Sequence, residues 1–328
     1  MKRHRKKSVS GLVRTVLLRL FLLLLLIAGV KGLYDTFFTE KESQGRFAAP
    51  TTPSLEANTG TGDETSPITL DNDQLYSSNA ILVRLTDHKI LYEKNSTNKV
   101  YPASLTKIMT AIVAIENLPD LALPVTLSSD MFQRLYDEDA SMAGFLPGET
   151  VPALDLLYGV LLPSGAECCV GLSEYIAGSE DAFTDLMNKK AEELGMQNTH
   201  FANTTGLNDE NHYTTVCDLA TLTEYALQND TFRDIFTTSA YSTAPTSLHP
   251  DGITFYSTMF KNLDSPDIDG GSILGGKTGY TSAAGLCLAS LASKNGVEYI
   301  LVTAGARGNH DTEQYNIEDA LFVYDSLN

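Results

Sequence analysis

The chain has 328 residues, enough for one large domain or two modest ones, and its 43% hydrophobic content can fill a core, which excludes an intrinsically disordered protein. Its formal net charge is −18, although the first 34 residues hold eight of the 23 lysines and arginines and no acidic residue. The remainder therefore sets 15 basic against 41 acidic residues, a net charge of −26, which argues against nucleic-acid binding.

The first 34 residues have the layout of an export signal. Lysines and arginines precede an apolar run over residues 20–30, so we expect the protein to leave the cytoplasm with its N-terminus inside. Residues 30–32 make a poor cleavage site because of a lysine, whereas residues 13–33 can span a membrane if Arg19 reaches towards the interface. We therefore favour an uncleaved membrane anchor over residues 1–34, with a cleaved signal peptide as the alternative.

Residues 35–76 are expected to form a flexible linker, because Ser, Thr, Pro, Gly and Glu dominate and large apolar residues are few. A globular domain is expected over residues 77–328, with no second domain after it. This domain opens with two strand patterns, at residues 80–85 and 89–92, that flank a short polar turn as in a hairpin.

Helical patterns dominate the middle of the domain, and strand patterns return near its end. We predict helices over residues 104–115, from the N-cap Ser179 to Gly195, after the N-cap Asp218, and over residues 314–327. Strands are predicted at residues 284–292 and 297–304, joined through Asn295-Gly296, a strong hairpin signal. Strands at both ends with helices between them predict an α+β fold, in which a helical lobe is inserted into a sheet built from distant parts of the chain.

Export would permit disulfides, and the chain has four cysteines, Cys168, Cys169, Cys217 and Cys287. Adjacent cysteines rarely bond each other, and all four lie in apolar patterns, so we interpret them as small buried hydrophobic residues. No Cys-x-x-Cys or His-Glu-x-x-His pattern is present, and the six histidines lack metal-ligand spacing. We therefore expect no metal and no cofactor.

The helix expected from residue 104 carries the most informative pair of polar residues. Apolar residues follow the i, i+3, i+4, i+7, i+8 rule, and Lys107 is the sole charged residue between Val100 and Ile115, so the helix should be buried. Burial lowers the pKa of a lysine towards the range where the neutral amine accepts a proton. Because Lys107 lies one turn after Ser104, its amine can deprotonate the Ser104 hydroxyl beside the unpaired N–H groups of a first helical turn.

A Ser-x-x-Lys pattern alone carries little weight, because Ser96-Thr-Asn-Lys99 matches it in a polar turn. On the alternative interpretation, Ser104 caps a core helix and Lys107 extends to solvent.

A second element is Lys277-Thr-Gly on a strand pattern. It offers a cation for a substrate carboxylate and a hydroxyl donor, or else it is a strand end with a solvated lysine. Between the two, Pro163 and Gly165 interrupt two helical patterns, which projects Ser164 from a turn unless it is a plain helix cap.

These three elements in this order are the signature of penicillin-binding proteins and class A β-lactamases. The chain resembles the serine-type D-alanyl-D-alanine carboxypeptidases, the low-molecular-mass penicillin-binding proteins, from Asn79 to its C-terminus. The stretches that carry the resemblance are residues 91–95, 101–110, 201–207 followed by His212-Tyr-Thr, and 276–281.

The resemblance implies a β-lactamase/penicillin-binding-protein transpeptidase-like fold, with an antiparallel sheet and a helical lobe. It implies that Ser104 is the acylated nucleophile, Lys107 the base and Ser164 a proton relay to the leaving amine. The substrate-binding residues would be Lys277, Thr278, Gly279 and Tyr280, with the first two at the substrate carboxylate and the N–H groups of Ser104 and Tyr280 as oxyanion hole. The implied role of His212 is structural.

The implied activity is removal of the terminal D-Ala from peptidoglycan stem peptides that end in D-Ala-D-Ala, with β-lactams as covalent inhibitors and no cofactor. The enzyme would act at the outer face of the cytoplasmic membrane, held by its N-terminal segment, or be secreted to the cell wall.

One departure from the family pattern leaves alternatives open. The family's Ser-Gly-Asn element ends in Ala166 here, so the side-chain amide that contacts substrate and the active-site lysine is missing. Glu167 is a candidate substitute, although an acid would raise the pKa of Lys107. A non-catalytic wall-binding homologue is therefore one alternative. A β-lactamase is another, disfavoured because no Glu-x-x-x-Asn pattern of the class A kind follows Ser164.

Overall fold

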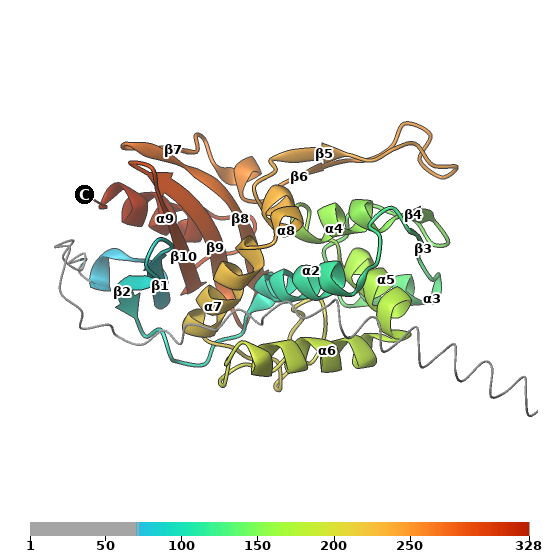
Figure 1. Cartoon of the computed structure of the whole chain (residues 1–328), viewed down its shortest axis with the longest axis horizontal. Helices are drawn as coiled ribbons and strands as arrows, with labels where there is room; N and C mark the ends of the chain where they lie inside the picture. The colour runs from blue at the N-terminus through green and yellow to red at the C-terminus, as the bar shows by residue number, and fades with distance from the viewer. Residues whose placement is uncertain (1–69, 71, 328) are drawn as a thin grey trace, which may run out of the picture. The chain divides into compact units, whose positions relative to one another are not determined.

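The computed structural model describes residue 70 and residues 72–327, so the predicted anchor over residues 1–34 and most of the predicted linker lie outside the described residues. The described chain contains a six-stranded sheet of order β2-β1-β10-β9-β8-β7, and every neighbouring pair is antiparallel (Figure 1). Its strands are β1 (Asn79–Arg84), β2 (Lys89–Lys94), β7 (Asp267–Ile268), β8 (Gly271–Thr281), β9 (Gly285–Lys294) and β10 (Val297–Ala306). The predicted α+β architecture is confirmed, because β1 from the start of the domain pairs with β10 from its end.

The sheet is covered on both faces, since alternate residues of one strand point to opposite sides. On β1, Ile81 and Val83 pack into the core of the helical lobe. Ala80 and Leu82 pack into a second core with the C-terminal helix α9 (Tyr315–Asp325). Figure 1 shows α9 against the sheet on one side and α7 (Val216–Leu227) towards the lobe. This double coverage explains why β1, β9 and β10 contain long, mostly buried apolar stretches.

The predicted hairpin between β9 and β10 is confirmed. Asn295 and Gly296 have φ angles of 52° and 78°. Two consecutive positive φ angles are what a two-residue type I′ turn requires, and asparagine and glycine adopt them most readily. The turn fixes the register of β9 against β10, with Lys294 opposite Val297.

The lobe surrounds α2 (Thr106–Asn117), whose residues from Thr106 to Ala114 are all buried. The other elements of the lobe and its edges are α3 (Asp130–Asp137), α4 (Ala153–Leu161), α5 (Ala166–Ala177), α6 (Glu180–Glu193), α8 (Asp230–Phe236), β3 (Pro124–Thr126), β4 (Thr150–Pro152), β5 (Ala240–Ser242) and β6 (Thr254–Tyr256). Three short 3₁₀ turns complete the described chain, η1 (Asn72–Gln74), η2 (Ala103–Leu105) and η3 (Phe260–Asn262). The burial of α2 from Thr106 to Ala114 is what the near absence of charge in this stretch predicted.

Two predicted helix boundaries differ from the structure. The helix expected from residue 104 starts as the 3₁₀ turn η2, and the α-helical hydrogen bonding begins at Thr106. Asp218 is not an N-cap, because α7 begins at Val216 and the cap is Thr215, whose hydroxyl accepts a hydrogen bond from Asp218 N. Ser179 does cap α6, through a bond from Ala182 N to its hydroxyl.

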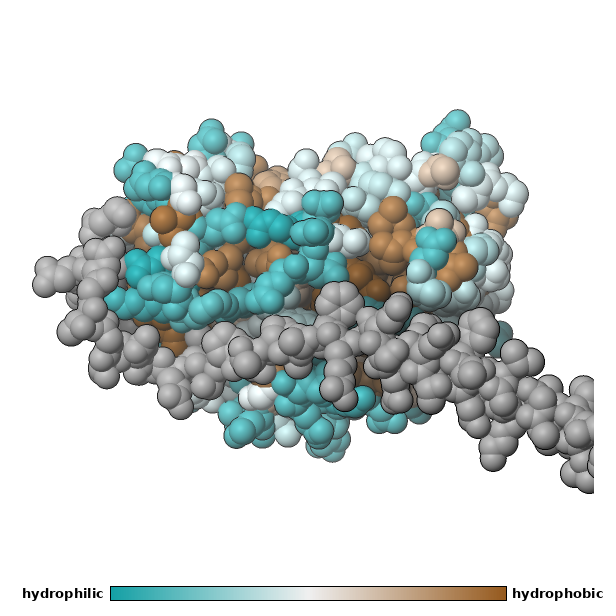
Figure 2. Space-filling model, in the orientation of Figure 1, coloured by the Kyte–Doolittle hydropathy of each residue, from teal (hydrophilic) through white to brown (hydrophobic). Residues whose placement is uncertain are grey.

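All four cysteines lie in the described part of the chain and are free thiols; three are buried and Cys217 is half-buried. Within residues 72–327, no helix has the length and apolar character to cross a bilayer. Figure 2 shows hydrophilic residues over much of the visible face of the domain, with hydrophobic patches between them.

Candidate active site

Ser104 lies in a tightly constrained turn. Its neighbour Ala103 has a φ of +47°, which is unusual for a residue with a side chain. The turn is enclosed from two sides by glycines: a Cβ on Gly206 would lie 1.9 Å from Ala103 O, and a Cβ on Gly279 would lie 3.0 Å from Ser104 N. The loop of residues 203–207 and strand β8 therefore approach the backbone of Ser104 at distances that no larger residue permits.

Lys107 extends from the first turn of α2 towards Ser104. Its Nζ lies 3.1 Å from Ser104 Oγ and donates to Thr205 O at 2.6 Å, and the residue is only 2% exposed. Burial lowers the pKa of Lys107, against smaller opposing effects of Cys169, Glu167, Cys168 and Glu180. A neutral amine that donates one N–H to Thr205 O retains a lone pair that can accept the Ser104 proton.

Ser164 lies in the turn between α4 and α5 with a φ of +70°. It is not a helix cap, because the N-cap of α5 is Gly165. The hydroxyl of Ser164 accepts a hydrogen bond of 3.0 Å from Lys277 Nζ, which reaches across from β8 and is completely buried. Burial, and then the charge of Lys107, hold the pKa of Lys277 well below its usual range. The structure thus brings together the three sequence elements as two Ser–Lys pairs.

The remaining residues singled out on β8 line the same region. The hydroxyls of Thr278 and Thr258 are 2.6 Å apart, and the ring of Tyr280 meets that of His310 edge-on at 4.8 Å between centroids. One residue further, Thr281 donates to Asn208 Oδ1 at 2.8 Å, which ties β8 to the segment that follows residues 203–207.

His212 supports the Ser104 turn from behind. Its Nδ1 accepts from Ala202 N at 3.0 Å, so Nε2 carries the hydrogen and donates to Thr106 Oγ1 at 2.7 Å. The Thr106 hydroxyl donates in turn to Ala103 O at 2.8 Å. Burial lowers the pKa of His212 to about 4, so the ring is neutral. This is the hydrogen-bonding role expected for His212, and it stabilises the positive φ of Ala103.

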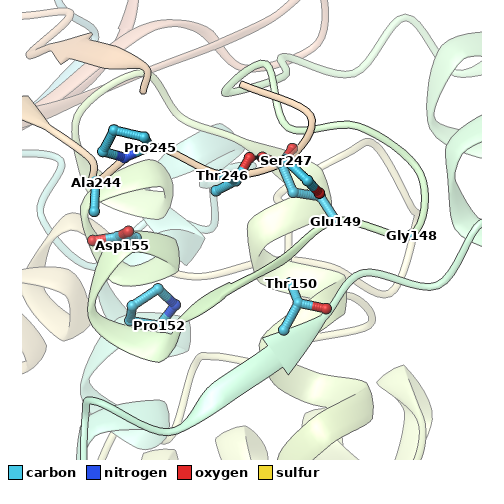
Figure 3. Close-up of a pocket in the computed structure, with 9 residues that line it drawn as sticks. All are labelled: Gly148, Glu149, Thr150, Pro152, Asp155, Ala244, Pro245, Thr246 and Ser247. Atoms are coloured by element: carbon cyan, nitrogen blue, oxygen red, sulfur yellow. Dashed lines mark hydrogen bonds between the residues drawn. The ribbon is translucent and has the colours of Figure 1, made fainter. Parts of the chain in front are cut away.

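A cavity of about 250 Å³ in the described domain is lined by none of these residues (Figure 3). It lies between β4, the start of α4 and the segment of residues 244–247. Its two buried carboxylates already have partners: Asp155 accepts from Tyr241 OH, and Glu149 accepts from Thr246 Oγ1 and from Leu146 N. Both carboxylates of this cavity are therefore already engaged in hydrogen bonds within the protein.

Comparison with known proteins agrees with this geometry. The profile of a family described as D-alanyl-D-alanine carboxypeptidase matches residues 66–308. The chain belongs to this family. Curated relatives include the D-alanyl-D-alanine carboxypeptidases DacF of Bacillus subtilis, 35% identical over 234 residues, and DacC of Escherichia coli, 30% identical over 262 residues. These matches cover 70% and 74% of this chain, which itself spans 57% and 60% of the relatives' lengths.

Solved structures of the family confirm the predicted fold. A Streptomyces DD-transpeptidase superposes with a TM-score of 0.68 at 26% identity, covering 77% of this chain and 97% of that one. A D-alanyl-D-alanine carboxypeptidase of Mycobacterium tuberculosis gives 0.66 at 23% identity, with 81% and 95% covered, a likeness of fold alone.

The departure from the carboxypeptidase pattern at Ala166 has a visible structural counterpart. Ala166 is buried, and its backbone N donates to Ser141 O at 2.7 Å. The carboxylate of Glu167 turns to the same segment, with Oε1 accepting from Ala143 N and Gly144 N, while Oε2 has no partner among the described residues. The hydrogen bonds of Glu167 therefore hold the segment of residues 141–144, and its effect on Lys107 is through charge, raising the pKa as expected.

Sequence reasoning missed Thr205, Gly206 and Thr106, which contact the catalytic turn through backbone or hydroxyl groups. The available signal was the stretch of residues 203–206, in which an asparagine followed three residues later by a glycine indicates a turn.

Substitution of Gly206 tests the enclosure of the Ser104 turn. Gly206 and Gly178 have nearly equal φ angles of +85° and +82°, but a Cβ on Gly178 would meet nothing within 4 Å. We expect Gly178→Ala to cost about 1 kcal/mol of folding free energy, from the positive φ alone. Gly206→Ala must also displace Ala103 O and should cost about 3 kcal/mol or more. Urea unfolding of both variants measures the difference, and equal costs would contradict the enclosure.

The neutral state of His212 predicts a pH dependence of stability. Because its folded-state pKa of about 4 lies below the ordinary histidine pKa of about 6.5, the unfolded chain binds an extra proton as the pH falls through this window. Stability from this group is therefore complete above about pH 6.5 and decreases by about 2 kcal/mol by pH 5. His212→Gln keeps a donor and an acceptor but cannot titrate. Urea unfolding at both pH values should show a smaller decrease in the variant than in the wild type, and parallel decreases would refute the assignment.

Proposed function

We propose that the protein is a serine D,D-carboxypeptidase that removes the terminal D-Ala from peptidoglycan stem peptides outside the cytoplasm. The observation that carries the proposal is the contact of 3.1 Å between Ser104 Oγ and the buried amine of Lys107, with the Ser164–Lys277 pair beside it. A buried lysine of lowered pKa within hydrogen-bond reach of a hydroxyl is the arrangement that nucleophilic catalysis by serine needs. The relatives DacF and DacC, which are D-alanyl-D-alanine carboxypeptidases, support the substrate class.

Acylation would begin with transfer of the Ser104 proton to the neutral amine of Lys107 as Oγ attacks the carbonyl carbon between the two D-alanines. The N–H groups of Ser104 and Tyr280 would stabilise the oxyanion. The C–N bond then breaks as Ser164 gives its proton to the departing amine of D-Ala and regains one derived from the Lys107 ammonium, so Lys107 returns to its neutral form. Water hydrolyses the resulting ester and restores the Ser104 hydroxyl, so no cofactor is consumed.

Two features of β8 suit a peptide with a free carboxylate. Thr278 is half-buried and offers a hydroxyl donor at the surface of the site. Lys277 lies beneath it, and a bound carboxylate would favour the charged form of this lysine and so raise its pKa again. Gly279, the next residue, lets β8 pack directly against the backbone of Ser104.

The remainder of the proposal concerns location and inhibitors. Residues 1–34 would anchor the enzyme in the cytoplasmic membrane with the N-terminus inside, and residues 35–76 would link the anchor to the catalytic domain at the outer face. If the segment is cleaved, the enzyme would be secreted to the cell wall. Penicillins would acylate Ser104 in the same way as the substrate.

Labelling with a fluorescent penicillin tests the nucleophile. Wild type should become covalently labelled, and Ser104→Ala should not, because the ester oxygen is removed. Ser96→Ala is a matched control, since Ser96 belongs to the second Ser-x-x-Lys pattern of the chain and donates to Glu93 instead. Labelling of folded Ser104→Ala, or none of folded wild type, would overturn the assignment.

Release of D-Ala from a pentapeptide separates the proposal from its two alternatives. Wild type should release D-Ala, which a non-catalytic wall-binding homologue would not do. A penicillin adduct that persists for many turnover times would exclude a β-lactamase, which must deacylate quickly.

Introducing the family's asparagine at position 166 should increase the rate of D-Ala release. Ala166→Asn would supply a side chain that can orient both the substrate and Lys107, and we expect about tenfold faster D-Ala release. Thermal unfolding must accompany the assay because Ala166 is buried and a larger side chain can overpack the site. An unchanged or slower rate in a folded variant would show that the site functions without the amide.

A further inference from the structure

The loop of residues 203–207 has a rigid internal framework. Asn203 Oδ1 accepts from Thr205 N at 3.2 Å and from Gly206 N at 2.8 Å, and its Nδ2 donates to Leu207 O at 3.0 Å. One side chain therefore fixes the backbone of the residues that follow it. The directions of the Thr204 and Thr205 carbonyls are set by this framework.

Both carbonyls meet α2. Thr204 O accepts from Thr110 Oγ1 at 2.7 Å, and Thr205 O accepts from Lys107 Nζ at 2.6 Å. The second contact is shorter than the contact between Lys107 and Ser104. The position of the loop therefore decides where the Lys107 amine lies and which way its lone pair points.

The loop is held from the opposite side by Glu180, the first residue of α6, which runs alongside α2 (Figure 1). Glu180 Oε1 accepts from Thr204 N at 3.1 Å and from Thr204 Oγ1 at 2.7 Å, and Thr204 is completely buried. Glu180 Oε2 accepts from Arg134 Nη2 at 2.8 Å, and the glutamate side chain is only 15% exposed. Charge-assisted bonds of this kind are stronger than neutral ones.

We propose that Glu180 is a positioning residue for catalysis, which holds Thr204 so that the Thr205 carbonyl binds one N–H of Lys107 and directs its lone pair at Ser104. The inference rests on the proposed function and extends it to a side chain that touches neither the substrate nor the nucleophile. It assigns to the α5–α6 boundary a role in the acylation step.

Glu180 also acts on Lys107 through its charge. The ionisable groups that face Lys107 are Glu167, Cys168 and Cys169 of α5, Glu180 of α6, Lys277 of β8, and His212, which is neutral. Among them Glu180 favours the charged ammonium and so raises the pKa of Lys107 against the effect of burial. Removing its charge should lower that pKa, so the neutral amine would be present at lower pH.

The test compares Glu180→Gln with Asp181→Asn. Asp181 lies in the same first turn of α6 and is exposed, so its variant loses the same charge at the same helix terminus without touching Thr204. The measurement is the second-order rate of acylation by a fluorescent penicillin from about pH 5 to pH 10, with thermal unfolding of each variant. In Glu180→Gln, the maximal rate should fall about tenfold or more, and the rising limb of the pH profile should move to lower pH. Asp181→Asn should match wild type in both respects.

The outcomes that would overturn the role of Glu180 differ from the one that would refute the proposed function. A Glu180→Gln profile that coincides with wild type, or one lowered at all pH values without any shift of the limb, would overturn the proposal. If Glu180→Gln does not fold, Thr204→Val removes only the hydroxyl bond to Glu180 and should lower the maximal rate without moving the limb; an unchanged rate would then overturn it. Absence of labelling in folded wild type would instead refute the proposed function itself.

Discussion

An amine that is almost entirely removed from water lies 3.1 Å from the hydroxyl of Ser104, and the surrounding structure is arranged around this contact. A buried ammonium is costly, so the folded state favours the neutral amine of Lys107, the form that can accept a proton. The cost is accommodated because the apolar helix α2 is fixed on all sides by the lobe. The proposed role of Lys107 therefore depends on core packing, since any opening of the lobe would rehydrate its amine and favour the charged form.

Much of this arrangement could be predicted from local patterns. The helical spacing of apolar residues in α2, with Lys107 as the sole charge between Val100 and Ile115, indicated its burial. The interrupted helices around Ser164 indicated a turn, and Asn295-Gly296 indicated the hairpin that joins β9 to β10. Each of these depends on residues within a few positions of each other. The same locality explains the error at Asp218, because Thr215 and Asp218 are both residue types that cap helices and the sequence alone did not separate them.

The backbone of the nucleophile turn could not be predicted in this way. Alanine rarely adopts a positive φ, and nothing next to Ala103 in the sequence requires one. The conformation is imposed by Gly206 and Gly279 on either side and by the His212–Thr106 hydrogen bonds beneath, which come from segments about 100 to 180 residues away in the chain. Strained turns of this kind depend on tertiary contacts, so their geometry becomes visible only in the folded molecule.

Opposing effects act on the pKa of Lys107 in this chain, which has Ala166 in place of the family's asparagine. Burial favours a neutral Lys107, whereas Glu167 and Glu180 favour its charged form. Both glutamates also bind backbone N–H groups of segments beside the site, residues 143–144 and residue 204. Each carboxylate thus combines two effects, since it orders a segment of the lobe and limits how far burial lowers the pKa of Lys107. The ordering of these segments favours catalysis, whereas a higher pKa of Lys107 opposes it. An uncharged amide would orient neighbouring groups without changing the charge of the site, so neither glutamate can replace it.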